Sequence, residues 1–133
     1  MNGELILKAI YKIYPNIQGG FVYWNTKHDL TEWENPIDGL VWENTEYEKP
    51  AWEQIERAVT LVELEDKKLI KIAQCQKYLN ETDWYIIKMS DPSNASVVPE
   101  SVFINRANAR VWQKNINACE TLEELNNINI NFN

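Results

Sequence analysis

The longest uninterrupted helical pattern in this chain is residues 50–80, PAWEQIERAVTLVELEDKKLIKIAQCQKYLN. Pro50 suits the first turn of a helix, where its missing N–H leaves no hydrogen bond unmade. Glu53 and Glu56 lie near the start, where acidic side chains favour the positive end of the helix dipole. Apolar residues recur at spacings of mostly three or four, which predicts an amphipathic helix with this stripe: Trp52, Ile55, Val59, Val62, Leu69 and Ala73.

The expected length of this helix raises a packing question. At 1.5 Å per residue it would be about 45 Å long, whereas a compact chain of this size has a diameter of about 35 Å. The helix must therefore protrude, pack on a partner, or break at the charged run Glu65–Lys68. A second stripe lies beside the first: Ala58, Leu61, Lys68, Ile72, Cys75 and Leu79. A protruding helix with two such stripes would need a partner, and a break would give two ordinary core helices. The residues alone leave these alternatives open.

Residues 1–49 predict a small α+β unit in front of the long helix. A short amphipathic helix is expected over residues 4–14, because Pro15 disfavours helical geometry at the residue before it. Runs of β-type residues predict strands at 21–24 and at 39–43. The unit contains few aliphatic residues from which to build a core of its own.

Residues 81–133 predict a helical C-terminal region. Thr82 has the features of a helix N-cap, and a further helix is expected over 99–119. Thr121 begins a capping-box sequence for a last short helix. The tail 126–133 alternates polar and apolar residues, and is expected either to add an edge strand or to fray. The apolar residues of the 99–119 helix are expected to face inward: Ile104, Ala107, Val111 and Ala118.

Two further features belong to this region. Arg106, Arg110 and Lys114 follow one another at four-residue spacing, which predicts a basic ridge on the side of the helix away from the apolar residues. Trp84 and Tyr85 are expected to lock the C-terminal helices together.

The whole pattern predicts an α+β fold: a small N-terminal helix with a short antiparallel sheet, a long central helix and a C-terminal helical hairpin.

Charge and composition exclude several function classes. The 133 residues include 13 basic and 20 acidic side chains, for a net charge of −7. Residues 29–66 hold twelve of the acids, and such a surface repels a phosphate backbone, so nucleic-acid binding is not expected. No apolar run is long enough to span a membrane, and the start lacks the pattern of a secretory signal. Two cysteines without CxxC spacing, Cys75 and Cys119, fit a reducing cytoplasm.

Side chains suited to catalysis are few. His28 is the only histidine, so neither a metal site nor a nucleophile–histidine pair has the usual ligands. The four glycines are too few for a phosphate-binding loop. We therefore expect no enzyme activity, no cofactor and no metal. Acids interleaved with aromatic residues leave a sugar-binding or glycosidase interpretation open: Glu32, Trp33, Glu34, Trp42, Glu43, Glu46, Tyr47 and Glu48.

Tryptophan is concentrated in the first half of the chain, where Trp24, Trp33, Trp42 and Trp52 fall within 29 residues. Trp is a favoured interface anchor, but a small sheet with few aliphatic residues can also use Trp as its core. We therefore expect about half of these in the core and at least one, Trp33 between two glutamates, exposed. The predicted partner-binding surface combines tryptophans with the helix stripe: Trp33, Trp42, Trp52, Ile55, Val59 and Val62.

The stretch Tyr78–Lys88, YLNETDWYIIK, with Val98–Glu100 and two later arginines, resembles the phage tail assembly chaperone (tail fibre assembly protein) family. The resemblance covers about residues 72–118. Residues 6–16, followed by a strand and a Trp-rich stretch, are similar to the start of small prophage tail-module proteins. The residues that match the chaperone motif are expected to be mainly structural: Thr82, Asp83, Trp84, Tyr85, Pro99, Arg106 and Arg110.

The resemblance implies a non-enzymatic helper that binds a phage tail or tail-fibre polypeptide in the host cytoplasm and shields it during virion assembly. The alternative is a structural virion component, a fibre-tip cap or tail adaptor, that stays in the particle. A sugar-binding lysis accessory is a third class. Self-association through the 50–80 helix is a further option, and neither a nucleic acid nor a membrane is an expected partner.

Overall fold

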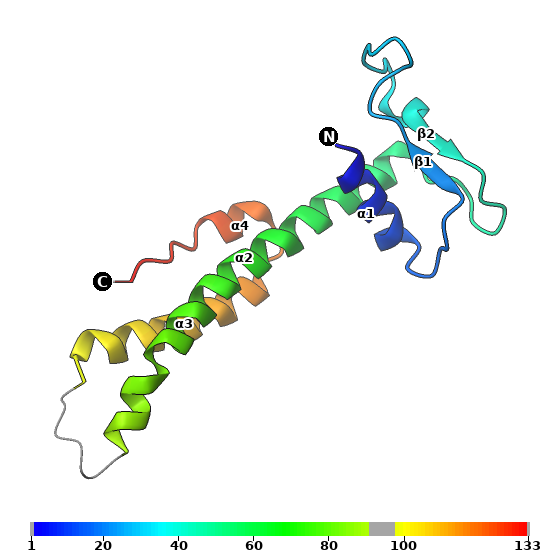
Figure 1. Cartoon of the computed structure of the whole chain (residues 1–133). Coiled ribbons are helices and arrows are strands. Elements are labelled where there is room, and N and C mark those ends of the chain that lie inside the picture. Colours follow the sequence, from blue (N-terminus) through cyan, green and yellow to red (C-terminus); the bar gives the residue numbers. More distant parts are fainter. Residues whose placement is uncertain (1, 91–97, 133) are drawn as a thin grey trace. The chain divides into compact units, whose positions relative to one another are not determined.

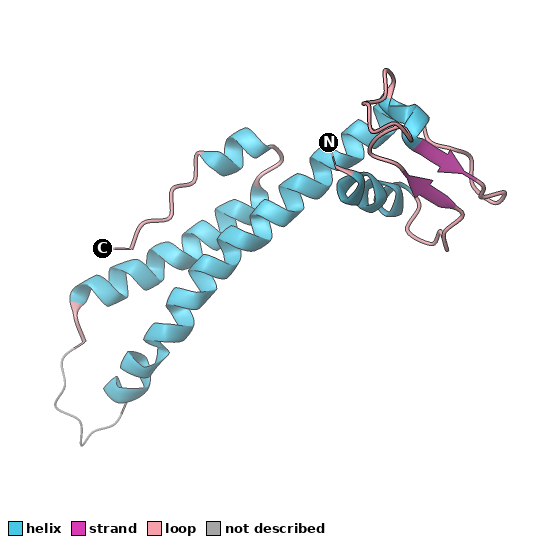
Figure 2. Ribbon diagram, turned by 45° about the horizontal axis from the view of Figure 1, so that its top comes forward, coloured by secondary structure: helices cyan, strands magenta, loops and turns pink. Residues whose placement is uncertain are grey.

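The computed structural model describes residues 2–90 and 98–132. The chain forms two compact units, Met1–Glu63 and Leu64–Asn133, called unit 1 and unit 2 below. The elements confirm the α+β prediction (Figures 1 and 2). In chain order they are α1 Gly3–Ile13, β1 Phe21–Tyr23, the 3-10 helix η1 Pro36–Gly39, β2 Leu40–Trp42, α2 Trp52–Met89, α3 Glu100–Ala118 and α4 Leu122–Asn126.

Unit 1 contains α1, the two-stranded sheet and the first turns of α2. The side chain of Asn2 caps α1 by accepting from the Leu5 N–H at 2.9 Å. The strands pair antiparallel with Val22 opposite Val41. The core of unit 1 draws on α1, the loop after it, β2 and α2: Ile6, Ala9, Ile10, Ile17, Leu40, Ile55, Ala58 and Val59. The last three come from α2, which thus adds aliphatic residues to the few that residues 1–49 contain.

The structure has α2 as one continuous helix. Residues 65–68 are helical, so a break at this charged run, one of the alternatives that the residues left open, is absent from α2. The helix begins at Trp52, after Pro50, and its first turn is completed by the Gln54 side chain, which accepts from the Ala51 N–H at 2.9 Å. The division between the two units lies within α2.

The predicted helix start at Thr82 is wrong, because α2 continues to Met89. The Thr82 hydroxyl donates to the Tyr78 carbonyl at 2.7 Å, one turn back in the same helix, instead of capping a new one. The loop expected at 90–94 falls mostly outside the described residues. Thr121 does cap α4, as predicted, by accepting from the Glu124 N–H at 3.1 Å.

In unit 2, α3 runs antiparallel to α2 (Figure 1). Arg106 contacts Thr82, whereas Gln113, later in α3, donates to the Ile72 carbonyl, earlier in α2, at 3.4 Å. The tail after α4 is neither an edge strand nor frayed: the Phe132 ring stacks on Tyr78 with centroids 4.1 Å apart. The three helices α2, α3 and α4 share one core in this unit: Leu64, Cys75, Leu79, Ala109, Ile116, Cys119 and Leu125.

Candidate functional site

The predicted partner-binding stripe on α2 is not a surface. Ile55 and Val59 belong to the core of unit 1, and Val62 is also buried. These side chains cannot contact a partner without unfolding part of the chain, so their expected role is corrected to a structural one. The sequence places them on one helix face, but periodicity does not show whether the chain itself covers that face.

The tryptophans of the predicted surface are half-buried, and Trp33 is not the exposed one. The Trp33 indole N–H donates to the Trp24 carbonyl at 2.7 Å, and the Trp42 indole N–H donates to the Tyr47 carbonyl at 2.9 Å. Trp42 and Trp52 both pack against the core of unit 1. The exposed tryptophan in this half of the chain is Trp24, which is 54% exposed and was not predicted to be part of the surface.

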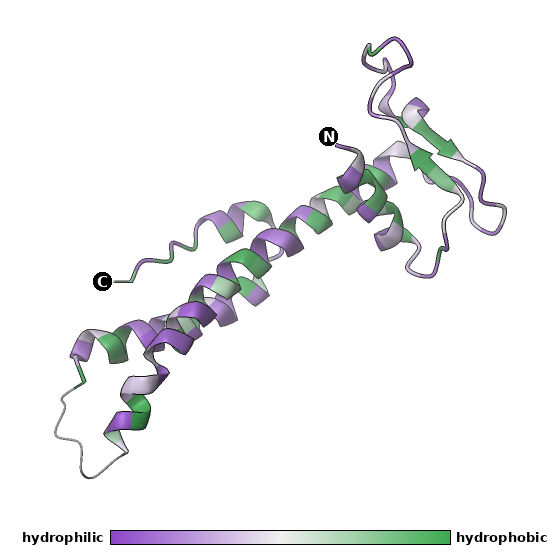
Figure 3. Ribbon diagram, in the orientation of Figure 1, coloured by the Kyte–Doolittle hydropathy of each residue, from purple (hydrophilic) through white to green (hydrophobic). Residues whose placement is uncertain are grey.

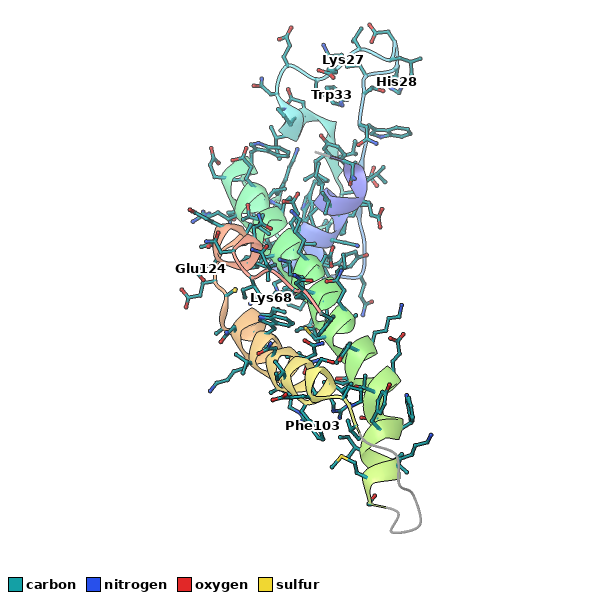
Figure 4. All side chains as sticks on the ribbon, turned by 90° about the vertical axis from the view of Figure 1, so that its left-hand side faces the viewer. Lys27, His28, Trp33, Lys68, Phe103 and Glu124 are labelled. Carbon is teal, nitrogen blue, oxygen red and sulfur yellow. The ribbon has the colours of Figure 1, made fainter. Side chains whose placement is uncertain are left out.

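Trp33 and Trp52 do share one feature, a hollow of about 500 Å³ in unit 1, called the aromatic hollow below. Figure 4 shows Trp33 with Lys27 and His28 at the loop between β1 and η1. The lining combines three aromatic rings with polar side chains and one carboxylate: Asn2, Tyr23, Asn25, Thr26, Glu32, Trp33, Pro36 and Trp52. Burial raises the pKa of the Tyr23 phenol above its ordinary value.

Among the described residues of unit 2, the Arg106 side chain makes three hydrogen bonds to α2 and is only 7% exposed. Its guanidinium donates to the Leu79 carbonyl at 2.7 Å, to the Thr82 hydroxyl at 2.6 Å and to the Asp83 carboxylate at 2.9 Å. We call this set the Arg106 clamp. It joins three of the residues that carry the family resemblance, and it contradicts the prediction that Arg106 belongs to an outer basic ridge. Arg110 and Lys114 are exposed, as expected.

The Arg106 clamp determines which side of α3 meets α2. Because Arg106 faces α2, the apolar residues predicted to face inward lie on the opposite side of the helix. Ile104 is 52% exposed and Val111 is 54% exposed. Figure 3 shows hydrophobic residues near the beginning of α3, and Figure 4 labels Phe103 there. These residues form the outward α3 face: Phe103, Ile104, Ala107, Val111 and Ala118.

Trp84, which is expected together with Tyr85 to lock the helices, lies partly at the surface. Trp84 is 45% exposed, and its ring stacks on Tyr85 with centroids 3.7 Å apart. The Lys88 ammonium lies 4.5 Å from the centroid of the Trp84 ring. The pair therefore adds exposed apolar area near the end of α2, together with Ile87 and Met89.

The remaining candidates for chemistry are one histidine, its neighbouring aspartate and the two cysteines. His28 is exposed, and its ring lies 6.2 Å from that of Trp24. Asp29 accepts from the Thr31 hydroxyl and N–H, and these bonds lower the pKa of its carboxyl. Cys75 and Cys119 are buried and free, and burial raises the pKa of the Cys75 thiol. Over residues 2–90 and 98–132, no group of three or more His, Cys, Asp or Glu side chains is arranged to hold a metal ion.

Compared with known proteins, the chain matches no family model, no curated protein and no solved structure. The resemblance to tail assembly chaperones therefore stays a prediction from the residues. Among the helices in the described part of the chain, none combines the length and apolar character needed to cross a membrane.

Proposed function

We propose that this protein is a non-catalytic assembly chaperone that binds a phage tail or tail-fibre polypeptide in the host cytoplasm and shields it until assembly. The family resemblance of residues 72–118 supplies the kind of partner. The outward α3 face is the observation that supports a binding role, because apolar side chains on one exposed helix face are typical of an interaction surface.

The Arg106 clamp explains how a stable unit can keep such a face exposed. A helix with apolar residues on two sides can pack with either side inward, and the choice decides which side meets solvent. Burying the Arg106 guanidinium against three oxygen acceptors fixes this choice, because turning α3 over would leave those acceptors without their partner. The clamp thus holds Ile104 and Val111 outward.

The outward α3 face also indicates what its partner carries. Exposed Arg110 and Lys114 lie on the same helix beside the apolar residues. A partner segment with an apolar stripe and carboxylates along one side would match both features. Shielding must be reversible, because the tail or fibre polypeptide has to exchange this contact for those of the assembled particle.

Co-expression with the product of the neighbouring open reading frame, followed by pull-down, tests the proposal. The double variant Ile104→Asp/Val111→Asp should capture at least tenfold less partner than wild type, because it places charges on the apolar face. Ser101→Asp/Asn117→Asp is the matched control, since it adds the same charge at exposed positions outside that face. Equal capture by both variants would argue against the outward α3 face as the binding surface.

Mass spectrometry of purified particles separates the proposed chaperone from a structural component. A chaperone leaves before the particle is complete, so the chain should be absent or far below the abundance of the tail proteins. Stoichiometric presence would instead favour a fibre-tip cap or tail adaptor that uses the same surface permanently.

A further inference from the structure

The aromatic hollow of unit 1 has a binding chemistry that the proposed chaperone function does not use. Its aromatic surface comes from three elements: Tyr23 from β1, Trp33 from the loop before η1, and Trp52 from the first turn of α2. A volume of about 500 Å³ lies within the usual range for small-molecule sites. All lining residues belong to unit 1, so the hollow is complete within that unit.

Two of the polar groups on these rings already have partners inside the chain. The Trp33 N–H donates to the Trp24 carbonyl at 2.7 Å, and the Tyr23 hydroxyl donates to the Pro36 carbonyl at 3.1 Å. Both rings are therefore held by hydrogen bonds at one end. What they offer a ligand is π-surface, which attracts cations, more than hydrogen-bond donors.

The local loop geometry brings a carboxylate to the same hollow. Thr26 and Glu32 form an antiparallel bridge, closed by a turn in which Leu30 takes the left-handed conformation (φ 67°). Glu32 and Thr26 thus reach the lining from the two ends of one short loop. Glu32 is the one ionisable carboxylate or ammonium side chain among the described lining residues.

The wider charge of unit 1 has the same sign as Glu32. Residues 1–63 carry eleven acidic and five basic side chains. Lys27 is the nearest cation in sequence to Thr26, but it does not line the hollow, and its charge contributes to lowering the pKa of Asp29. A positively charged ligand is therefore attracted to this unit over longer range as well as by Glu32.

From this combination we infer that the aromatic hollow binds an organic cation, an alkylammonium or guanidinium group, between the rings of Tyr23, Trp33 and Trp52 and the carboxylate of Glu32. Aromatic rings with a nearby carboxylate are the usual means of recognising such groups. The cation has two sources with the same chemistry, a small quaternary ammonium compound or the side chain of an arginine or lysine in a polypeptide. A sugar would have to use other polar groups of the lining, because the Trp33 N–H and the Tyr23 hydroxyl already have partners.

Titration of the full chain with choline, with N-acetylarginine amide and with 3,3-dimethylbutan-1-ol tests this inference. The last compound is the neutral counterpart of choline. NMR of the indole N–H signals, assigned by single Trp→Phe variants, reports each tryptophan separately. We expect the Trp33 and Trp52 signals to shift and saturate with at least one cation, at a Kd on the order of millimolar. Binding by choline alone identifies a small-molecule source, and binding by the arginine amide identifies a polypeptide side chain.

A matched pair of variants then tests the carboxylate. Glu32→Gln removes the charge that lines the hollow. Glu34→Gln removes an exposed charge two residues away, and Glu34 does not line the hollow. Glu32→Gln should weaken cation binding at least fivefold, and Glu34→Gln less than twofold. Preserved indole dispersion in both variants shows that each is folded.

Three results would overturn the inference. The first is no shift of Trp33 or Trp52 with either cation, and the second is an equal shift with the neutral alcohol. The third is that methyl glucoside moves the same signals while the cations do not, which would assign the hollow to sugars. None of these results bears on partner capture by the outward α3 face, so this inference and the proposed function can fail independently.

Discussion

The guanidinium of Arg106, on α3, donates to the hydroxyl of Thr82, two turns before the end of α2, at 2.6 Å. The same hydroxyl donates to the Tyr78 carbonyl within α2 at 2.7 Å. Thr82 therefore accepts from one helix and donates within the other, and its side chain is buried while doing so. Charge-assisted hydrogen bonds of this kind are among the stronger ones in proteins.

Replacing Arg106 with lysine should destabilise unit 2 by about 1–3 kcal/mol. Lysine keeps the charge, but a single ammonium cannot reproduce the planar fork that reaches Leu79, Thr82 and Asp83 together. Urea unfolding followed by circular dichroism measures the change. Arg110→Lys, at an exposed position of the same helix, should stay within about 0.5 kcal/mol of wild type.

Trp84→Ala should change the stability by less than about 1 kcal/mol. Trp84 is 45% exposed and is held by Tyr85 and Lys88 on its own helix, so little buried area is lost. Trp112→Ala is the informative comparison, because Trp112 is half-buried and meets the Phe132 ring edge-on at 5.4 Å. It should lose about 2–4 kcal/mol in the same measurement. A larger loss for Trp84 than for Trp112 would contradict the structure.

Gly39→Ala should disturb Trp33. A Cβ at this position would lie 2.5 Å from the Trp24 carbonyl oxygen and 2.8 Å from the Trp33 indole nitrogen, both of them members of one hydrogen bond. We expect a loss of about 1–3 kcal/mol and a displaced Trp33 indole N–H signal in the NMR spectrum. Gly19→Ala tests backbone conformation instead, because Gly19 has a positive φ of 103° and open space where a Cβ would point. It should leave the Trp33 signal in place.

The stability of unit 1 should fall as the pH rises above about 10. Burial raises the pKa of the Tyr23 phenol in the folded chain, so the unfolded chain releases this proton at a lower pH than the folded chain does. Deprotonation therefore favours unfolding, and the effect begins near the ordinary phenol pKa. Urea unfolding at a series of pH values from 9 to 11 measures it. Tyr23→Phe should flatten this dependence, whereas Tyr11→Phe, at an exposed position, should retain it.

Both thiols should react slowly with Ellman's reagent in the native protein. Cys75 is fully buried with a raised pKa, and the Cys119 thiol donates to the Asn115 carbonyl at 3.3 Å. Their reaction should become fast only in urea, at the concentration where unit 2 unfolds. Fast reaction of either thiol in native buffer would show that the core of unit 2 opens without unfolding.

The sequence predicts the elements well where a local signal determines them. The proline at 15 ends α1, the β-type runs form β1 and β2, and the Thr121 capping box starts α4. The helix start predicted at Thr82 is wrong because a threonine followed by an aspartate has the same composition at a helix start and inside a helix. Only the partner of its hydroxyl distinguishes the two cases, and that partner is the carbonyl one turn earlier.

The candidate surfaces could not be predicted from periodicity, for a physical reason. α3 has an apolar side through Ile104 and Val111 and a mixed side through Arg106 and Ala109, and hydrophobicity alone selects the first for the core. The buried guanidinium reverses that choice. The prediction that Trp33 is exposed was wrong for a different reason. Its acidic neighbours Glu32 and Glu34 indicate solvent, but the Trp33 side chain turns inward and donates to the Trp24 carbonyl.

The Arg106 clamp and the outward α3 face have no residue in common, although both lie on one helix. Substitutions among Ile104, Ala107 and Val111 can therefore alter what the protein recognises while its folding stays intact. Such a separation allows a lineage to change partners stepwise, with each intermediate sequence still producing a well-formed protein.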